Sequence, residues 1–321
     1  MKEELSELLK RSVEKFGRSP VEKNILNGQD FNCAGYEIAI RRACIDLTPR
    51  TLNRKPDSGE KMPVDVFLDK DNPESFITKI IGYFSDKAMS KEEYDEWHND
   101  ICEKCILPTI RKYYTNKDKE NSEVCYGKAQ KIVNMTLKGC YCLRGAMTEY
   151  KNHFQYCHVA LDGYTLAWYE RHDNKVDKKW SYLDYDTYIQ IQNHIREFAA
   201  DSDIGLFNDS DLTPFQREFL IWPLEMMVNT VKCINSCYGG LISESYAEDY
   251  FKTYGMANDL KMAYILLGSE SIASLDAPYV SWLTNDIPEH QTGKRASADH
   301  ILSLWSIFNS TAINPENGNK K

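Results

Sequence analysis

Apolar residues recur at helical spacing in one segment of this chain after another, and this periodicity constrains the fold more than any other feature. In residues 2–17 and 184–200 the apolar side chains return every three or four positions along one face. Alternating strand-like runs are scarce, and only residues 62–68 (MPVDVFL) have the length and composition of a short strand. The pattern therefore predicts a mainly α protein, a multi-helix globular core with at most a few short strands.

Capping residues, prolines and polar stretches divide this pattern into elements. Ser90 and Glu93 have the spacing of a capping box, Asp162 is placed to cap another helix, and Pro108 and Pro223 should break or bend the helices that contain them. The segments 48–62 and 115–123 are polar and predict loops. We expect helices over 2–17, 33–47, 76–88, 91–114, 127–144, 163–172, 184–200, 214–238, 243–267 and 296–310.

Length and hydropathy limit the classes of protein to consider. A chain of 321 residues predicts about two domains. Its mean hydropathy is −0.54, and it contains no apolar run near the roughly 20 residues that a membrane span needs. We therefore expect no membrane partner. The predicted organisation is an N-terminal helical and loop region at 1–74, a helical core at 75–225, a C-terminal helical region at 226–311 and a loose tail at 312–321.

The charge distribution is uneven. The net charge of −9 argues against nonspecific coating of nucleic acid, but residues 101–151 carry ten Lys and Arg against five Asp and Glu. A single basic region in an acidic protein is the charge pattern that a localised anion site would give. A solvated helix face explains the same composition, and both interpretations stay open.

The cysteines and histidines offer one candidate metal site. The chain begins with a charged amphipathic helix rather than a signal peptide, so we expect a cytoplasmic protein of bacterial or phage origin with reduced thiols. His98, Cys102 and Cys105 share a helix face and could bind zinc with a fourth ligand. A CxxC pair inside a helix lacks the usual zinc-binding turn, so buried core is the favoured interpretation and no metal or other cofactor is expected. The fourth-ligand candidates are Cys140, Cys142, Cys157 and His158.

The sequence lacks the motifs that are typical of several enzyme classes. The chain has no Walker A sequence, no GxGxxG loop, no HExxH and no GxSxG. An NTPase, a dinucleotide enzyme, a zincin and an α/β-hydrolase are therefore not expected. Clustered aspartates between 184 and 211 would suit a metal-dependent nuclease, but acidic loops and helix caps explain them more simply.

Residues 126–169 carry the most chemistry. Lys131, Asn134 and Lys138 lie at i, i+3 and i+7 on one face of the helix predicted at 127–144, and Lys128 and Gln130 lie beside them. The sequence HFQYCHVALDGYTLAWYERH follows, rich in aromatic residues and histidine. A helix cap and a solvated face are again the plain interpretation. The candidate nucleic-acid contacts are Lys128, Gln130, Lys131, Asn134, His158 and Trp168.

These residues resemble the core of helix-hairpin-helix DNA glycosylases of the 8-oxoguanine type. The matching pieces are KIVNMTLKGCYCL, with Lys138, and HVALDGYTL, with Asp162, and they cover about 45 of the 321 residues. The resemblance implies that the Lys138 amine attacks the sugar C1′ with help from Asp162 and that the partner is DNA. Lys128 and Lys131 compete with Lys138 for that role. The iron–sulfur cysteine spacing of some members is absent.

A second hypothesis needs no chemistry. The chain would then be a non-catalytic helical interaction or accessory factor that binds another protein, with the basic helix as its docking face. Base excision and protein docking are therefore the two functions that the sequence leaves in competition.

Overall fold

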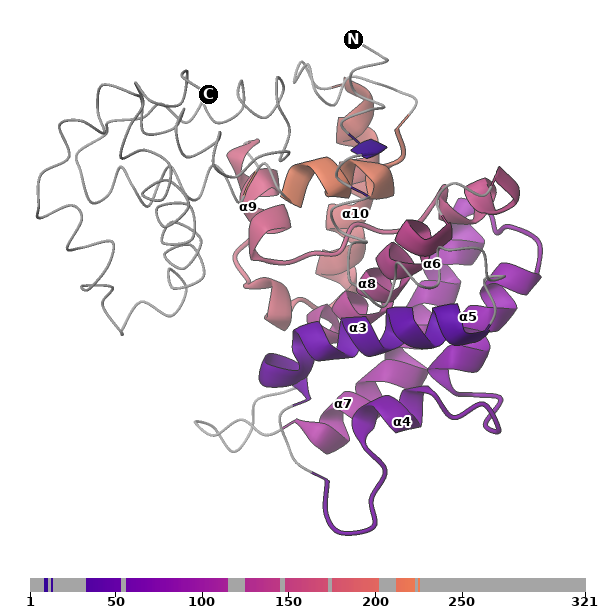
Figure 1. Ribbon diagram of the computed structural model, residues 1–321. Helices are drawn as coiled ribbons and strands as arrows, with labels where there is room; N and C mark the ends of the chain where they lie inside the picture. Colours follow the sequence, from indigo (N-terminus) through magenta and orange to yellow (C-terminus); the bar gives the residue numbers. More distant parts are fainter. Residues whose placement is uncertain are drawn as a thin grey trace, which may run out of the picture. The chain divides into compact units, whose positions relative to one another are not determined.

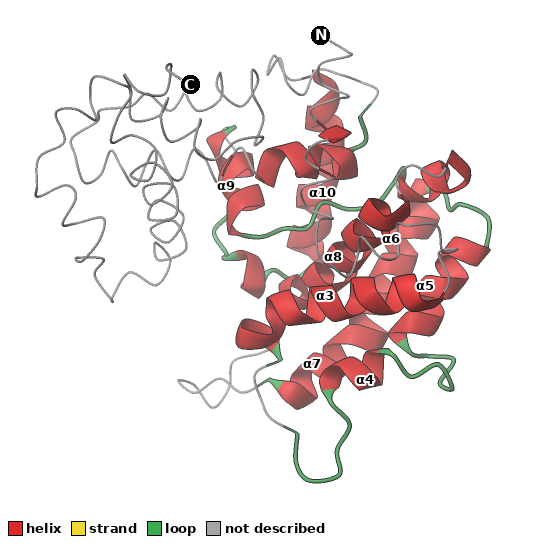
Figure 2. Ribbon diagram, viewed as in Figure 1, coloured by secondary structure: helices red, strands yellow, loops and turns green. Residues whose placement is uncertain are grey.

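The computed structural model describes residues 9, 10, 13, 33–52, 56–114, 125–144, 148–172, 175–201, 212–222 and 225. The chain divides into two units, residues 1–219 and 220–321, and nearly all of the described residues lie in the first. These residues form helices and loops without any strand, as Figure 2 shows. The prediction of a mainly α protein is confirmed.

The first unit has eight α-helices among its described residues, joined by two short 3₁₀ segments and one π-helical segment (Figure 1). Residues 214–219 are also helical. In chain order the elements are α3 (Cys33–Thr51), α4 (Pro63–Phe67), α5 (Phe76–Ser85), α6 (Lys91–Asp100), η1 (π, Ile101–Ile106), α7 (Leu107–Tyr113), α8 (Tyr126–Arg144), η2 (3₁₀, Thr148–Phe154), α9 (Gly163–Arg171), η3 (3₁₀, Trp180–Tyr182) and α10 (Tyr185–Asp201).

Helix α8 lies at the centre of this unit. It packs against α3 over much of its length and also contacts η1, α7, η3 and α10. Gly139 allows the close approach of α3, because a Cβ there would lie 3.1 Å from the Cβ of Ala39. Gly127 is required more strictly, because a Cβ would lie 1.8 Å from the carbonyl oxygen of Trp180. Both faces of α8 are therefore enclosed by protein.

The predicted helix at 91–114 is present as three consecutive pieces. Ser90 and Glu93 form the predicted capping box at the start of α6. The chain then passes through the π-helical η1 into α7, whose first turn contains Pro108. Proline has no N–H to donate to the carbonyl four residues earlier, so a regular α-helical ladder cannot continue through it. The predicted break near Pro108 therefore takes the form of a change of helix type.

Two local predictions are wrong. Residues 62–68 were expected to form a strand, but Pro63–Phe67 form α4, because proline suits the first turn of a helix and Pro63 and Phe67 share its buried face. Residues 48–62 were expected to form a loop, but α3 continues to Thr51. The helices predicted at 243–267 and 296–310, the bend at Pro223 and the tail at 312–321 lie outside the described residues, as does almost all of the helix predicted at 2–17.

No helix in the described part of the chain combines the length and hydropathy that a bilayer-spanning segment needs.

Candidate functional site

The polar side chains of α8, on which the predicted chemistry depends, are buried. Lys128, Lys131 and Lys138 are only 5%, 8% and 3% exposed, and Gln130 and Asn134 are fully enclosed. The solvated helix face that was weighed against a binding site is therefore not what the structure contains. Buried polar groups need partners, since an unsatisfied one costs about 1–3 kcal/mol.

Much of this polarity serves residues 156–162, which we call the buried connector. The connector has no neighbouring strand, so side chains satisfy its backbone. Gln192 of α10 accepts from the N–H of Val159 at 3.0 Å and donates to its C=O at 2.7 Å. Gln130 of α8 does the same for Leu161, at 3.2 Å and 2.8 Å. Two glutamines thus replace the hydrogen bonds that a β-ladder would supply.

The backbone between these two residues is satisfied in the same way. The N–H of Ala160 donates to Glu218 at 2.9 Å, and its C=O accepts from the hydroxyl of Thr165 at 3.0 Å. Asn134 donates a further bond to the carbonyl of Val159 at 3.2 Å. Every backbone N–H and C=O of residues 159–161 is therefore bonded to a side chain. The local role of Gln130, Asn134 and Glu218 is to hold the connector inside the fold.

Asp162 is the helix cap that the sequence predicted. Its carboxylate accepts from the backbone N–H groups of Tyr164 and Thr165 at the start of α9. Burial by itself would raise the pKa of Asp162, but Lys131 at 2.7 Å and the backbone N–H of Thr165 hold it below its usual value. The carboxylate is therefore ionised and fully engaged at neutral pH.

The ion pairs of the α8 lysines differ from the Lys138–Asp162 pair that the glycosylase resemblance implies. The Asp162 carboxylate forms its ion pair with Lys131, whereas Lys138 pairs at 2.7 Å with Glu218. Lys128 lies over the ring of Tyr114, with its Nζ 3.3 Å from the ring centroid. An attacking amine must be unprotonated, and an ammonium held against a carboxylate is the opposite state.

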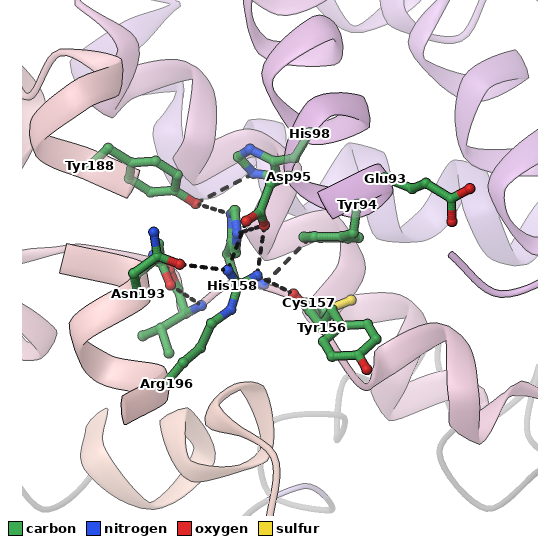
Figure 3. A network of polar contacts seen from close by, with 12 residues as sticks. Glu93, Tyr94, Asp95, His98, Tyr156, Cys157, His158, Tyr188, Asn193 and Arg196 are labelled. Carbon is green, nitrogen blue, oxygen red and sulfur yellow. Dashed lines mark hydrogen bonds and ion pairs between the residues drawn. The ribbon is translucent and has the colours of Figure 1, made fainter. Parts of the chain in front are cut away.

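A chain of hydrogen bonds crosses the same interior, and Figure 3 shows the part of it around His98, Tyr188 and His158. Tyr126 contacts Nδ1 of His98, and His98 Nε2 lies 2.9 Å from the Asn134 side-chain oxygen, which can only accept. His98 is therefore the Nε2–H tautomer. Asn134 donates to the Tyr188 hydroxyl at 2.9 Å. That hydroxyl lies 2.9 Å from Nδ1 of His158 (Figure 3).

This series of hydrogen bonds ends near the surface, at the ion pair between Asp95 and Arg196. Nε2 of His158 donates to Asp95 at 2.8 Å, and the guanidinium of Arg196 holds both oxygens of the same carboxylate. Burial lowers the pKa of His158 to about 4, although Asp95 acts in the opposite direction. Burial also lowers the pKa of His98. Both rings are therefore neutral, and each donates one hydrogen bond and accepts another.

The remaining predicted contacts are also internal. His158 and Trp168, predicted to bind nucleic acid, are buried, and the Trp168 ring packs against His172 at 5.0 Å. His98 and Cys102 of the candidate metal site are buried, and Nδ1 of His98 lies 3.8 Å from the Cys102 sulfur. Among the described residues, no three His, Cys, Asp or Glu side chains are grouped to hold a metal ion. Buried core accounts for His98 and Cys102.

Sequence reasoning missed an open cleft of about 590 Å³ beside α5 and α6, which we call the α5–α6 cleft. A tryptophan on a highly charged helix, Trp97 in KEEYDEWHND, is the one signal that pointed to it. Its walls combine charged, apolar and aromatic side chains. They are Glu74, Lys79, Asp86, Lys87, Ala88, Met89, Glu93, Glu96, Trp97, Asp100, Ile101, Lys104 and Cys105.

The chemistry of the two regions differs. In the interior around α8, amines, carboxylates and imidazoles are held in fixed pairs, which gives rigidity. In the α5–α6 cleft, charged side chains and a partly exposed aromatic ring line one open cavity, which suits binding. Comparison of the chain with protein-family models, with curated proteins and with solved structures gives no match.

Proposed function

We propose that this chain is a non-catalytic helical interaction factor that binds another protein through the α5–α6 cleft. The observation that carries the proposal is the pairing of the α8 lysines. Lys131 and Lys138 are each buried in an ion pair, and while that pair is closed neither amine is free to bind phosphates or to attack a sugar. The cleft therefore replaces the basic helix as the docking face.

The interior network supports this function indirectly. A fully satisfied set of buried polar groups fixes a single arrangement of the helices around it. Helices α6 and α8 share that network through His98 and Asn134, so the cleft wall formed by α6 is held in place before any partner arrives. A preformed surface loses less conformational entropy on binding.

A reducing compartment such as the cytoplasm suits the chain, because the described cysteine side chains are free thiols.

A site-specific photo-crosslinker tests the docking face. Benzoylphenylalanine in place of Met89, inside the cleft, should give a discrete crosslinked product that unlabelled wild-type protein competes away. The same probe in place of Tyr182, which is exposed on η3 and does not line the cleft, is the control. Equal products from both positions would overturn the assignment of the cleft as the docking face.

Base excision on DNA remains the second candidate because one observation favours it. An amine and a carboxylate do meet at the start of α9, where Lys131 lies 2.7 Å from Asp162. That is the Lys/Asp pairing of the glycosylase resemblance, with Lys131 in place of Lys138. The activity would require the ion pair to open and the amine to lose its proton.

Borohydride trapping on duplex DNA that contains 8-oxoguanine separates the two functions. If the chain is an interaction factor, no covalent protein–DNA adduct forms. An adduct that forms with the wild type and disappears in Lys131→Gln, with Lys138→Gln as the comparison, would establish excision chemistry and refute the interaction proposal.

A further inference from the structure

The α5–α6 cleft has an excess of negative charge at its walls. Five carboxylates and three lysine amines line it, which leaves two negative charges in excess. Two of the lysines are already neutralised by neighbours, since Lys79 pairs with Glu74 at 2.8 Å and Lys104 pairs with Asp100 at 2.7 Å. The field inside the cleft therefore depends on the charges that remain.

Those charges are mostly acidic. The Glu93 carboxylate accepts from the backbone N–H of Ser90 and belongs to the capping box. The Asp86 and Glu96 carboxylates make no hydrogen bond or ion pair with any other residue that the structure describes. Both side chains are exposed. With Lys87 as the one lysine left over, the cleft offers two carboxylates that a cation from outside can reach.

The cleft also offers apolar surface. One face of the Trp97 indole stacks on Tyr83 at 4.5 Å, and this contact holds the ring in a fixed position in the wall. Ile101, at the start of the π-helical η1, also lines the cleft. Single π-helical turns occur frequently at functional sites. An indole held in the same cleft as unpaired carboxylates is a favourable surface for the alkyl stem and charged head of lysine or arginine.

We propose that the α5–α6 cleft binds a lysine- or arginine-bearing segment of the partner protein. The cationic heads face Asp86 and Glu96, and the apolar parts of the segment lie against Trp97. This inference rests on the proposed interaction function, to which it adds the chemical class of the partner. Charge complementarity of this kind sets specificity and association rate more than affinity.

Fluorescence anisotropy with three labelled peptides tests the partner class on the full-length chain at physiological salt. The probes are short peptides in which alanine alternates with arginine, with glutamate or with serine. The wild type should bind the arginine peptide most tightly. Glu96→Lys should weaken that binding about tenfold or more, because it replaces an attraction with a repulsion. Circular dichroism checks that the variant is folded.

The matched control is Glu170→Lys. Glu170 is exposed on α9, does not line the cleft, and its replacement changes the net charge by the same amount. It should leave binding within about twofold. Equal weakening by the two variants would mean that the peptide responds to net charge alone, and would overturn the proposed site.

Failure of the partner class is distinguishable from failure of the interaction function. If the glutamate peptide binds instead and Lys104→Glu weakens it, the cleft is a docking site but the basic partner is wrong. If no peptide binds in a way that depends on Glu96 or Lys104, the basic-segment proposal is overturned. The Met89 crosslink and the DNA trapping then decide the proposed function separately.

Discussion

Replacing Gln130 by methionine is the sharpest perturbation of the interior of α8. Methionine has nearly the same length and helix propensity as glutamine, so the variant removes the amide without leaving a large cavity. It leaves the N–H and C=O of Leu161 without the partners that Gln130 supplied. Each unsatisfied buried group costs about 1–3 kcal/mol, and burial of the thioether returns about 1–2 kcal/mol. We expect a net loss of about 2–3 kcal/mol.

Urea unfolding followed by circular dichroism measures this change in the free energy of unfolding. The matched control is Gln155→Met, because Gln155 is exposed and the same substitution there should stay within about 0.5 kcal/mol. Hydrogen exchange gives a local readout, since the Leu161 amide should lose protection in Gln130→Met alone. Equal stability of the two variants, together with a protected Leu161 amide, would show that the connector does not depend on the Gln130 side chain.

Three further predictions concern charge, pH and capping. Lys138→Met should destabilise the fold by about 3–5 kcal/mol, because Glu218 becomes an unpaired buried charge. Adding Glu218→Gln to this variant should restore most of the lost stability. Full stability of the single variant in urea unfolding would contradict this. The pKa of His158 is about 4 in the folded chain and about 6.5 in the unfolded chain. As the pH falls, the unfolded state therefore binds the proton first. The free energy of unfolding should fall by up to about 3 kcal/mol between about pH 6.5 and about pH 4. Unfolding free energies that do not change over this range would refute a buried neutral His158. Ser90→Ala should cost about 1 kcal/mol through loss of the capping box at α6, measured by the same unfolding experiment, with no loss as the contrary result.

Local features of this fold were predictable because their causes lie within a few residues. The capping box of Ser90 and Glu93 is a contact across three positions, and the Asp162 cap reaches backbone groups two and three residues away. Pro108 acts on its own turn of helix. These signals are complete in the sequence, so they could be recognised there.

The burial of the polar face of α8 could not be predicted in the same way. Helical periodicity identifies two faces but does not distinguish a solvated polar face from an interior one. The groups that enclose it are distant in sequence, since Leu161 lies 31 residues from Gln130 and Glu218 lies 80 residues from Lys138. The α5–α6 cleft depends in the same way on tertiary contacts, such as the stacking of Tyr83 of α5 on Trp97 of α6.

If the α8 lysines belong to the interior, lysine acetylation of the native protein, read by mass spectrometry, should separate them from surface lysines. Lys61 and Lys104, whose side chains are 62% and 74% exposed, should react rapidly. Lys128, Lys131 and Lys138 should stay unmodified until the chain is unfolded. Rapid acetylation of these three at the rate of Lys61 and Lys104 would place α8 at the surface and contradict the account.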